Sequence, residues 1–282
     1  MNEVSELVGR MCFELVPMKS VETAIADLPP GSSVSVTCSP AKGLAATQEL
    51  VGRLLDLGHD AVPHVAARQI EDPEHVARLA GWIRGCGLRE VFVIAGDAPK
   101  AAGPYADSLS FLDDLLEHDT GLARVGVAAY PDGHPFIDRA ALHDALHAKQ
   151  ALFTAAGIQG SATTQMCFDA ARIRTWLSVE RCDGLTMPVA VGVPGVVDRG
   201  RLLRMGVRIG VGVSLRYLRK NRAAMAALLA PGGYDPTGLV RTIASDAATL
   251  GVTSLHSFTF NAVAPTRAWQ QALLTPDVAG RV

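Results

Sequence analysis

The stretch Val91-Phe92-Val93-Ile94-Ala95-Gly96-Asp97 joins five apolar residues to a turn glycine and an acid. An unbroken apolar run of this length is typical of a strand that is buried on both faces, as in a parallel sheet. Segments with helical periodicity lie on either side of it, at residues 73–84 and 108–118. The order helix, strand, turn, helix is the unit of a parallel α/β fold.

The same unit recurs along the whole chain. The eight expected strands are residues 11–16, 33–37, 61–65, 91–95, 125–129, 161–166, 188–193 and 253–258. Between them, two more helices are expected at residues 43–57 and 139–156. Eight strands that alternate with helices over 282 residues predict a (β/α)8 TIM barrel, which typically takes ~250 residues.

The segment 201–250 is too long for a single crossover. We therefore expect extra helices before the last strand, one of them over the basic stretch 216–222. No linker or internal repeat divides the chain, so we predict that residues 1–282 form a single barrel domain.

Composition excludes several classes of protein. Lys and Arg number 26 against 28 Asp and Glu, which argues against a nucleic-acid binder that neutralises phosphates. Although 49% of the residues are hydrophobic, no run reaches the ~20 apolar residues of a membrane span. The acidic start lacks a signal peptide, and the five cysteines form no Cys-x-x-Cys pair. We expect a cytoplasmic protein that binds neither nucleic acid nor membrane; a homo-oligomer is compatible with the sequence.

Polar residues follow most of the expected strands. In a barrel of this kind, side chains at the carboxyl ends of different strands converge on one mouth. Any one of them alone would be explained by a loop hydrogen bond, but together they predict a functional site. They are Glu14, Thr37, His64, Asp97, Tyr130 with His134, Gln165 and Asn261.

These residues lie in seven motifs. The motifs and their order along the chain resemble those of the methylenetetrahydrofolate reductase family. The most specific is Val127-Ala128-Ala129-Tyr130-Pro131-Asp132-Gly133-His134-Pro135, which is similar to the family's V-A-x-Y-P-E-x-H-P. The others are Phe13-Glu14-Leu15-Val16-Pro17, Val34-Ser35-Val36-Thr37, Pro63-His64, Gly96-Asp97 with Tyr105-Ala106, Thr164-Gln165-Met166-Cys167-Phe168-Asp169, and His256-Ser257-Phe258-Thr259-Phe260-Asn261. The resemblance runs over nearly the whole chain.

The resemblance implies hydride transfer between 5,10-methylenetetrahydrofolate and 5-methyltetrahydrofolate, with NADH or NADPH as the reductant and FAD as the cofactor. Ring opening needs a proton on N10, and Glu14 is the implied general acid, because apolar neighbours favour a protonated carboxyl. Asp97 is implied to stabilise the cationic iminium. The implied folate-binding residues are Gln165, Phe168, Asp97 and Phe258. The implied cofactor residues are Thr37, His64, Gly96, Asp97, Tyr105, Ala106, Tyr130, His134, Lys149 and Arg68.

The departures from the family pattern concern the flavin. Ala95 replaces an Arg, Phe153 replaces a Lys, and Ala262 replaces the Arg of the last motif. Lys149 lies one helical turn before Phe153, and Arg68 could supply another phosphate contact. FAD binding is the prediction, and direct hydride transfer from NADH without flavin is the alternative.

Three further alternatives remain open from the sequence. The enzyme could oxidise methyltetrahydrofolate in a demethylation pathway, or the barrel could bind folate or a partner without catalysis. His143 and His147 have the i,i+4 spacing of metal ligands, but Asp144 stands where H-E-x-x-H has Glu. We expect the two histidines to lie on a solvated helix face, and we predict no metal site.

Overall fold

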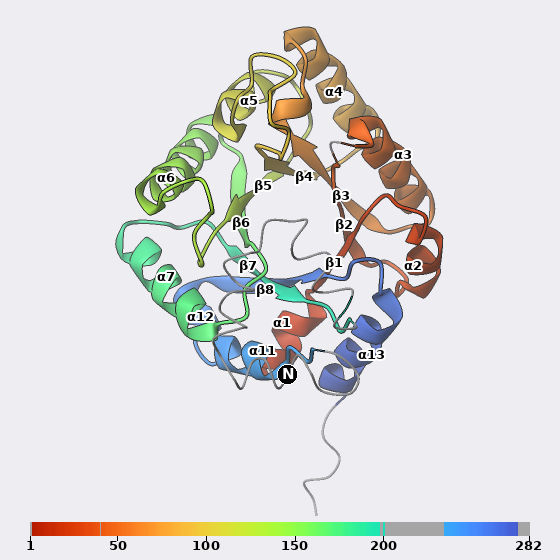
Figure 1. The fold of residues 1–282 in the computed structure, drawn as a ribbon, viewed down its shortest axis with the longest axis vertical. Coiled ribbons are helices and arrows are strands. Elements are labelled where there is room, and N and C mark those ends of the chain that lie inside the picture. Colours follow the sequence, from red (N-terminus) through yellow and green to blue (C-terminus); the bar gives the residue numbers. More distant parts are fainter. Residues whose placement is uncertain (1, 40, 198–199, 201–233, 276–282) are drawn as a thin grey trace, which may run out of the picture.

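The computed structural model describes residues 2–39, 41–197, 200 and 234–275. Its centre is a closed barrel of parallel strands in sequence order, in which the last strand pairs with the first (Figure 1). The strands are β1 (Cys12–Leu15), β2 (Ser33–Val36), β3 (Asp60–Ala66), β4 (Glu90–Ile94), β5 (Arg124–Ala129), β6 (Gln159–Thr164), β7 (Val189–Pro194) and β8 (Val252–Phe258). The predicted TIM barrel is confirmed, with every strand near its expected place.

Helices surround the barrel on its outside (Figure 1). They are α1 (Glu3–Gly9), α2 (Val21–Asp27), α3 (Gly43–Asp56), the 3-10 turn η1 (Ala67–Gln69), α4 (Pro73–Gly85), α5 (Ser108–Leu115), α6 (Arg139–Ala156), α7 (Ala170–Cys182), α11 (Thr237–Ala244), α12 (Ala247–Leu250) and α13 (Val263–Leu274). Helices α11 and α12 confirm extra helices before the last strand. The helix expected over 216–222 lies outside the described residues.

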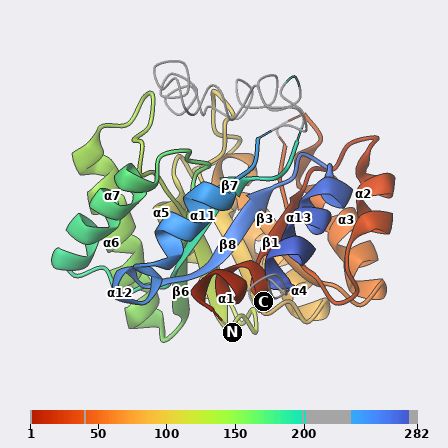
Figure 2. The same ribbon diagram turned by 90° about the horizontal axis from the view of Figure 1, so that it is seen from below.

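Figure 2 shows α1 near the N-terminus, where it leads into the amino end of β1. This helix was not predicted from the sequence. It packs against β8 and α13. No helix within the described ranges combines the length and the apolar character that crossing a membrane requires.

Aspartates begin the four helices that follow β3 to β6. The carboxylates of Asp72, Asp107, Asp138 and Asp169 accept hydrogen bonds from backbone N–H groups in the first turns of α4, α5, α6 and α7. Such caps satisfy donors that have no partner inside a helix and typically contribute about 1 kcal/mol each. The sequence thereby fixes where each helix starts relative to the mouth of the barrel.

The main core lies between the barrel and its helices, because successive strand residues point to opposite faces. Phe13 and Leu15 of β1 are almost fully buried in this core, whereas Glu14 between them points into the barrel. Ser35 and His64 are buried on the inner side in the same way. The inside of the barrel is therefore more polar than continuous apolar runs predicted.

Gly192 on β7 marks a tight contact inside the barrel. A Cβ atom there would lie 2.2 Å from the carbonyl oxygen of Thr164 and 2.8 Å from the ring of Phe258. The backbone oxygen belongs to a neighbouring strand and has little freedom to move. Only glycine lets β6, β7 and the Phe258 ring approach so closely.

We predict that Gly192→Ala lowers the free energy of unfolding by about 1–3 kcal/mol, the usual cost of overpacking a rigid site. Urea denaturation followed by circular dichroism measures the change. Gly52→Ala is the matched control, because Gly52 lies in α3 with no atom near its added methyl group. The control should be neutral or slightly stabilising. Equal stability of the two variants would contradict the close packing at Gly192.

Candidate active site

The first and last strands bring an acid and an imidazole together inside the barrel. Cys12 lies opposite His256 in the ladder between β1 and β8, and Glu14 lies opposite Phe258. The Oε2 atom of Glu14 is 3.1 Å from Nε2 of His256, and both side chains are buried. His256 belongs to the last motif but was not singled out from the sequence, because only closure of the barrel pairs it with Glu14.

The surroundings of His256 favour its cationic form. Burial alone would lower its pKa, but the hydrogen bonds and charges of Cys12 and Glu14 outweigh burial and raise the pKa to about 10. His256 is therefore protonated at neutral pH, and its Nε2 atom lies within hydrogen-bond distance of Oε2 of Glu14. Glu14 is buried as expected, but its environment is this polar partner and not the apolar side chains that flank it in sequence.

A second buried histidine is held in the opposite state. Nε2 of His64 lies 2.6 Å from Oγ of Ser35, and the ring of Phe92 lies 4.6 Å away between centroids. Burial, assisted by the repulsion of His256, lowers the pKa of His64 to about 3. One imidazole is thus neutral and the other cationic, with their ring centroids 6.4 Å apart.

The loop after β8 holds the carboxyl end of β1 in place. The hydroxyl of Thr259 donates to the carbonyl oxygen of Glu14. The amide of Asn261 accepts from the N–H of Val16 at 2.8 Å and donates to its carbonyl oxygen at 2.9 Å. Asn261 has a positive φ of 62°, a conformation that asparagine tolerates better than most residues. Asn261 was predicted as a residue of the site, and in the structure its side chain supports the loop.

A second group of predicted residues gathers at the rim, on the loops after β4 and β5. The rings of Tyr130 and His134 meet edge to face at 5.3 Å. Burial raises the pKa of Tyr130, and the nearby charge of Asp97 adds to this shift. The Asp97 carboxylate is exposed and also acts on His134, where it opposes the lowering of that pKa by burial. Asp97 is thus available to a ligand at the rim.

Glycine is needed immediately before Asp97. Gly96 has a φ of 91°, and a Cβ atom there would lie 2.9 Å from Cβ of Ala66 at the end of β3. The turn places Asp97 beyond the end of β4. The backbone conformation therefore explains why glycine precedes Asp97, in addition to the family resemblance.

The predicted folate-binding side chains lie around β6, β7 and β8. Phe258 is buried edge-on against His256, with a centroid separation of 5.0 Å. Phe168 meets Tyr234 edge-on at 5.1 Å, a partner that the sequence did not reveal. The side-chain oxygen of Gln165, which is partly exposed, accepts from the N–H of Met166 at 2.8 Å.

Four of the predicted cofactor residues take part in hydrogen bonds that hold loops in place. They are Thr37, Arg68, Tyr105 and Ala106. Arg68 donates to the carbonyl oxygens of Ala106 at 3.0 Å and Ala98 at 3.1 Å, which ties the loop after β4 to the loop after β3. The buried hydroxyl of Tyr105 donates to Asp114. The carbonyl oxygen of Thr37 accepts from Thr47. A phosphate contact from Arg68 stays a prediction, since backbone oxygens already engage its guanidinium.

A cavity of about 970 Å³ lies between strands β4 and β5 and helices α5, α6 and α7. Ala95, Tyr130 and Lys149 line it, as does Arg139 at the start of α6. Burial lowers the pKa of Lys149, and the charge of Asp107 opposes this. Within the described part of the chain, the Lys149 ammonium makes no hydrogen bond or ion pair. Arg139 was missed because no motif includes it, although its place at the start of a helix near the mouth was predictable.

The prediction that His143 and His147 form a solvated face is wrong. Both rings are partly buried and contact Glu180 of α7. The two histidines of α6 contact α7 because α7 runs beside α6 around the barrel (Figure 1). Sequence spacing along one helix does not reveal such a contact with the next helix.

The closed barrel, with polar side chains from several strands at one mouth, defines a TIM-barrel protein of the kind that carries its site at the carboxyl ends of the strands. The model of the family described as methylenetetrahydrofolate reductase matches residues 23–213, which is more than half of the chain. The protein belongs to this family. Glu14 and His256 lie outside the matched segment, to which β1 is joined by its pairing with β2 and β8 by its pairing with β7.

Similar folds occur among solved structures. An uncharacterised protein from Clostridium thermocellum, described as binding two copies of 5-methyl-5,6,7,8-tetrahydrofolic acid, is 12% identical with a TM-score of 0.61. The alignment covers 95% of this chain and 96% of that one. Yersinia pestis DHPS with a pterine-sulfa conjugate is 13% identical, covers 94% and 91% of the two chains, and has a TM-score of 0.44.

We predict that the pairing of Glu14 with His256 makes the free energy of unfolding decrease as the pH rises into the alkaline range. The pKa of His256 is about 10 in the folded protein, against about 6.5 for an unfolded histidine. Between these values the folded state binds more protons, so this contribution is complete below about pH 6.5 and is lost as the pH rises toward 10. Urea denaturation at neutral and alkaline pH should show a steeper loss for the wild type than for His256→Gln. Equal slopes would contradict a cationic His256.

Proposed function

We propose that this protein interconverts 5,10-methylenetetrahydrofolate and 5-methyltetrahydrofolate by hydride transfer from NADH or NADPH, with FAD as the cofactor and residues 1–282 acting as one reductase domain. The observation that carries the proposal is the buried pair of Glu14 and His256 at 3.1 Å. Family membership supports it, as does the methyltetrahydrofolate bound by the similar barrel from C. thermocellum.

The pair supplies the proton that the reaction needs. Cleavage of the bond between the methylene carbon and N10 places an electron pair on N10, which must receive a proton. The proton on Nε2 of His256 moves to Oε2 of Glu14, and Glu14 passes it to N10. His256 is then neutral and takes up a proton from solvent. In the reverse direction the same atoms remove the proton from N10, so the pair also serves an oxidation of methyltetrahydrofolate.

The remaining predicted residues bind and orient the folate. Asp97 at the rim places a negative charge near the cationic iminium that forms on ring opening. Phe258 beside His256 offers an aromatic edge or face to the pterin, and Phe168 with Gln165 extends this surface along β6. Each of these positions lies on or beyond the carboxyl end of a strand.

The cavity beside α6 fits a dinucleotide. Its volume of about 970 Å³ is at the upper end of common ligand pockets, and Lys149 and Arg139 provide positive charge for a pyrophosphate. Tyr130 lines the cavity and is close enough to Asp97 for its pKa to be raised by that charge, so a flavin ring beside Tyr130 would lie near the proposed folate site. When bound, FAD would carry the hydride between the nicotinamide and the folate.

A specific observation favours a second candidate, in which NADH passes its hydride directly to the folate without flavin. Ala95 removes one cation from the cavity, and the guanidinium of Arg68 is engaged by two backbone oxygens. In this candidate the roles of Glu14 and His256 are unchanged. A barrel that only binds folate or a partner would have no use for the buried ionic pair, which costs desolvation free energy.

We predict that Glu14→Gln lowers the turnover of methylenetetrahydrofolate about 10²–10⁴-fold, the usual share of a general acid, while folate binding persists. The substitution keeps the size of the side chain and an oxygen for His256. NADH consumption measures turnover, and fluorescence titration measures binding. Glu22→Gln on α2 is the control, since Glu22 is exposed and pairs with Arg53 outside the site. Full activity of Glu14→Gln would overturn the general-acid role.

The visible spectrum of the purified protein tests the cofactor. We expect the bands of oxidised flavin, and we expect Lys149→Ala to weaken flavin binding about 10–100-fold, as loss of a charged hydrogen bond does. Arg78→Ala on the outer helix α4 is the cation control and should retain the flavin. A colourless protein that still oxidises NADH with methylenetetrahydrofolate would establish the direct-transfer candidate. A colourless and inactive protein would support a binding function.

A further inference from the structure

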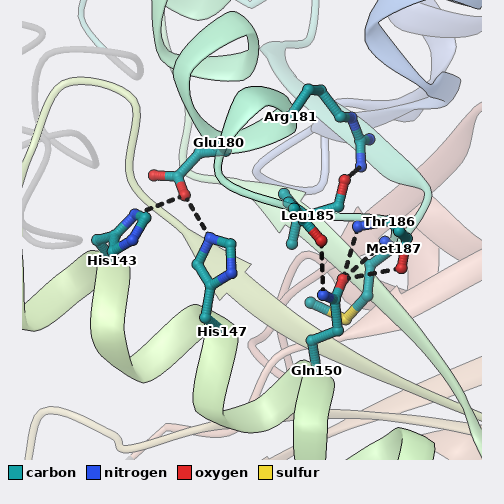
Figure 3. Close-up of polar contacts among 9 residues, drawn as sticks. His143, His147, Gln150, Glu180, Arg181, Leu185, Thr186 and Met187 are labelled. Atoms are coloured by element: carbon teal, nitrogen blue, oxygen red, sulfur yellow. Dashed lines mark hydrogen bonds and ion pairs between the residues drawn. The ribbon is translucent and has the colours of Figure 1, made fainter.

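We propose that His143, His147 and Glu180 bind one divalent metal ion of the zinc class between α6 and α7, on the outside of the barrel. None of the three residues takes part in the proposed hydride transfer. The proposal rests on the way in which two histidines of one helix converge on a single buried carboxylate of the next (Figure 3).

The convergence is tight. Oε2 of Glu180 lies 2.9 Å from Nδ1 of His143 and 3.0 Å from Nε2 of His147. The two rings are separated by 4.3 Å between centroids, because residues four apart lie on the same face of a helix. All three ligand atoms lie within 4.8 Å of one another.

The two nitrogen–oxygen separations are close to the edge length of a coordination polyhedron. Zinc binds imidazole nitrogen and carboxylate oxygen at roughly 2.0–2.2 Å, so neighbouring ligand atoms in a tetrahedral site lie about 3.3 Å apart. The observed separations are shorter by a few tenths of an ångström, which small side-chain rotations correct. Without metal, the two histidines donate hydrogen bonds to the carboxylate through the same nitrogens. Metal binding replaces those two protons and leaves the arrangement of heavy atoms almost unchanged.

The carboxylate gives the metal an electrostatic reason to bind. Glu180 is only 4% exposed, and both His143 and His147 lie within hydrogen-bond distance of its Oε2 atom. Burial of a carboxylate costs desolvation free energy, and a divalent cation bound to its oxygen offsets that cost directly. Two nitrogens and one oxygen favour zinc, cobalt or nickel over magnesium and calcium, which prefer all-oxygen ligands.

Neighbouring contacts hold the two helices in position before any metal binds. The Gln150 side chain of α6 accepts from the N–H groups of Thr186 at 2.6 Å and Met187 at 3.1 Å, and donates to Gly184 at 2.9 Å. Arg181, next to Glu180, donates to the carbonyl oxygen of Leu185 at 2.6 Å (Figure 3). The three ligands are therefore preorganised, so binding costs little conformational entropy.

The site opens on the cavity beside α6. His143 and Glu180 both line that cavity, which leaves room for water or another donor at the fourth position of a tetrahedral ion. Helix α6 buries Leu146 and Phe153 fully, and its other residues are at least partly exposed. A metal ion that joins α6 to α7 would stabilise the wall of the cavity.

Isothermal titration of the full chain, first freed of metal with a chelator, tests the proposal with zinc and cobalt as probes. We expect one zinc ion per chain, a higher melting temperature, and a cobalt spectrum typical of tetrahedral nitrogen and oxygen ligands. His147→Gln and Glu180→Gln should each weaken zinc binding by more than the roughly 10–100-fold that loss of an outer partner costs. His118→Ala in the turn after α5 and Cys182→Ser on α7 are the controls and should bind as the wild type does.

Several outcomes would overturn the proposal. One is zinc binding to the wild type no tighter than to His147→Gln. Another is loss of binding in Cys182→Ser with retention in Glu180→Gln, which would assign the ion to a thiol. Loss in His256→Gln with retention in His147→Gln would place the ion inside the barrel, where Glu14, His64 and His256 also lie close together. Because His147 is partly exposed, His147→Gln is expected to fold, and its circular dichroism verifies this.

Discussion

Closure of the barrel by the pairing of β8 with β1 is the constraint on which the site depends. It brings residues 242 positions apart in sequence into hydrogen-bond contact, and it surrounds them with strands on every side. The same ladder leads into the loop where Asn261 holds the end of β1. A sheet left open between these two strands would keep every other strand pair and lose the acid–imidazole pair, since no other element could take the place of β8.

The sequence was sufficient for the fold because each strand is a local signal. The run from Val91 to Ile94 and its seven counterparts are recognisable without any tertiary contact, and their alternation with helices defines the barrel. The aspartate caps mark helix starts in the same local way. The first helix, α1, was not predicted because it is only 7 residues long and shows little helical periodicity in its apolar residues.

The site was predictable only in part, and the reason is physical. Residues such as Glu14, Asp97 and Tyr130 were found because strand ends meet at the mouth of a barrel. The partner of Glu14 was not, since pairing across the closure depends on register. Glu180 was missed for a similar reason: it faces His143 and His147 from a neighbouring helix. Arg68 shows another limit, because its hydrogen bonds to two backbone oxygens could not be predicted from the residue type.

The separate positions of the cavity and the acid–imidazole pair have an evolutionary consequence. The cavity and its cations lie between α6 and the barrel, whereas the acid–imidazole pair lies inside the barrel, supported by β1 and β8. A substitution such as that at Ala95, which lines the cavity, can therefore occur along this wall while the acid–imidazole pair is kept. On the proposed function, a lineage built on this scaffold could exchange one redox partner for another while the barrel stays folded.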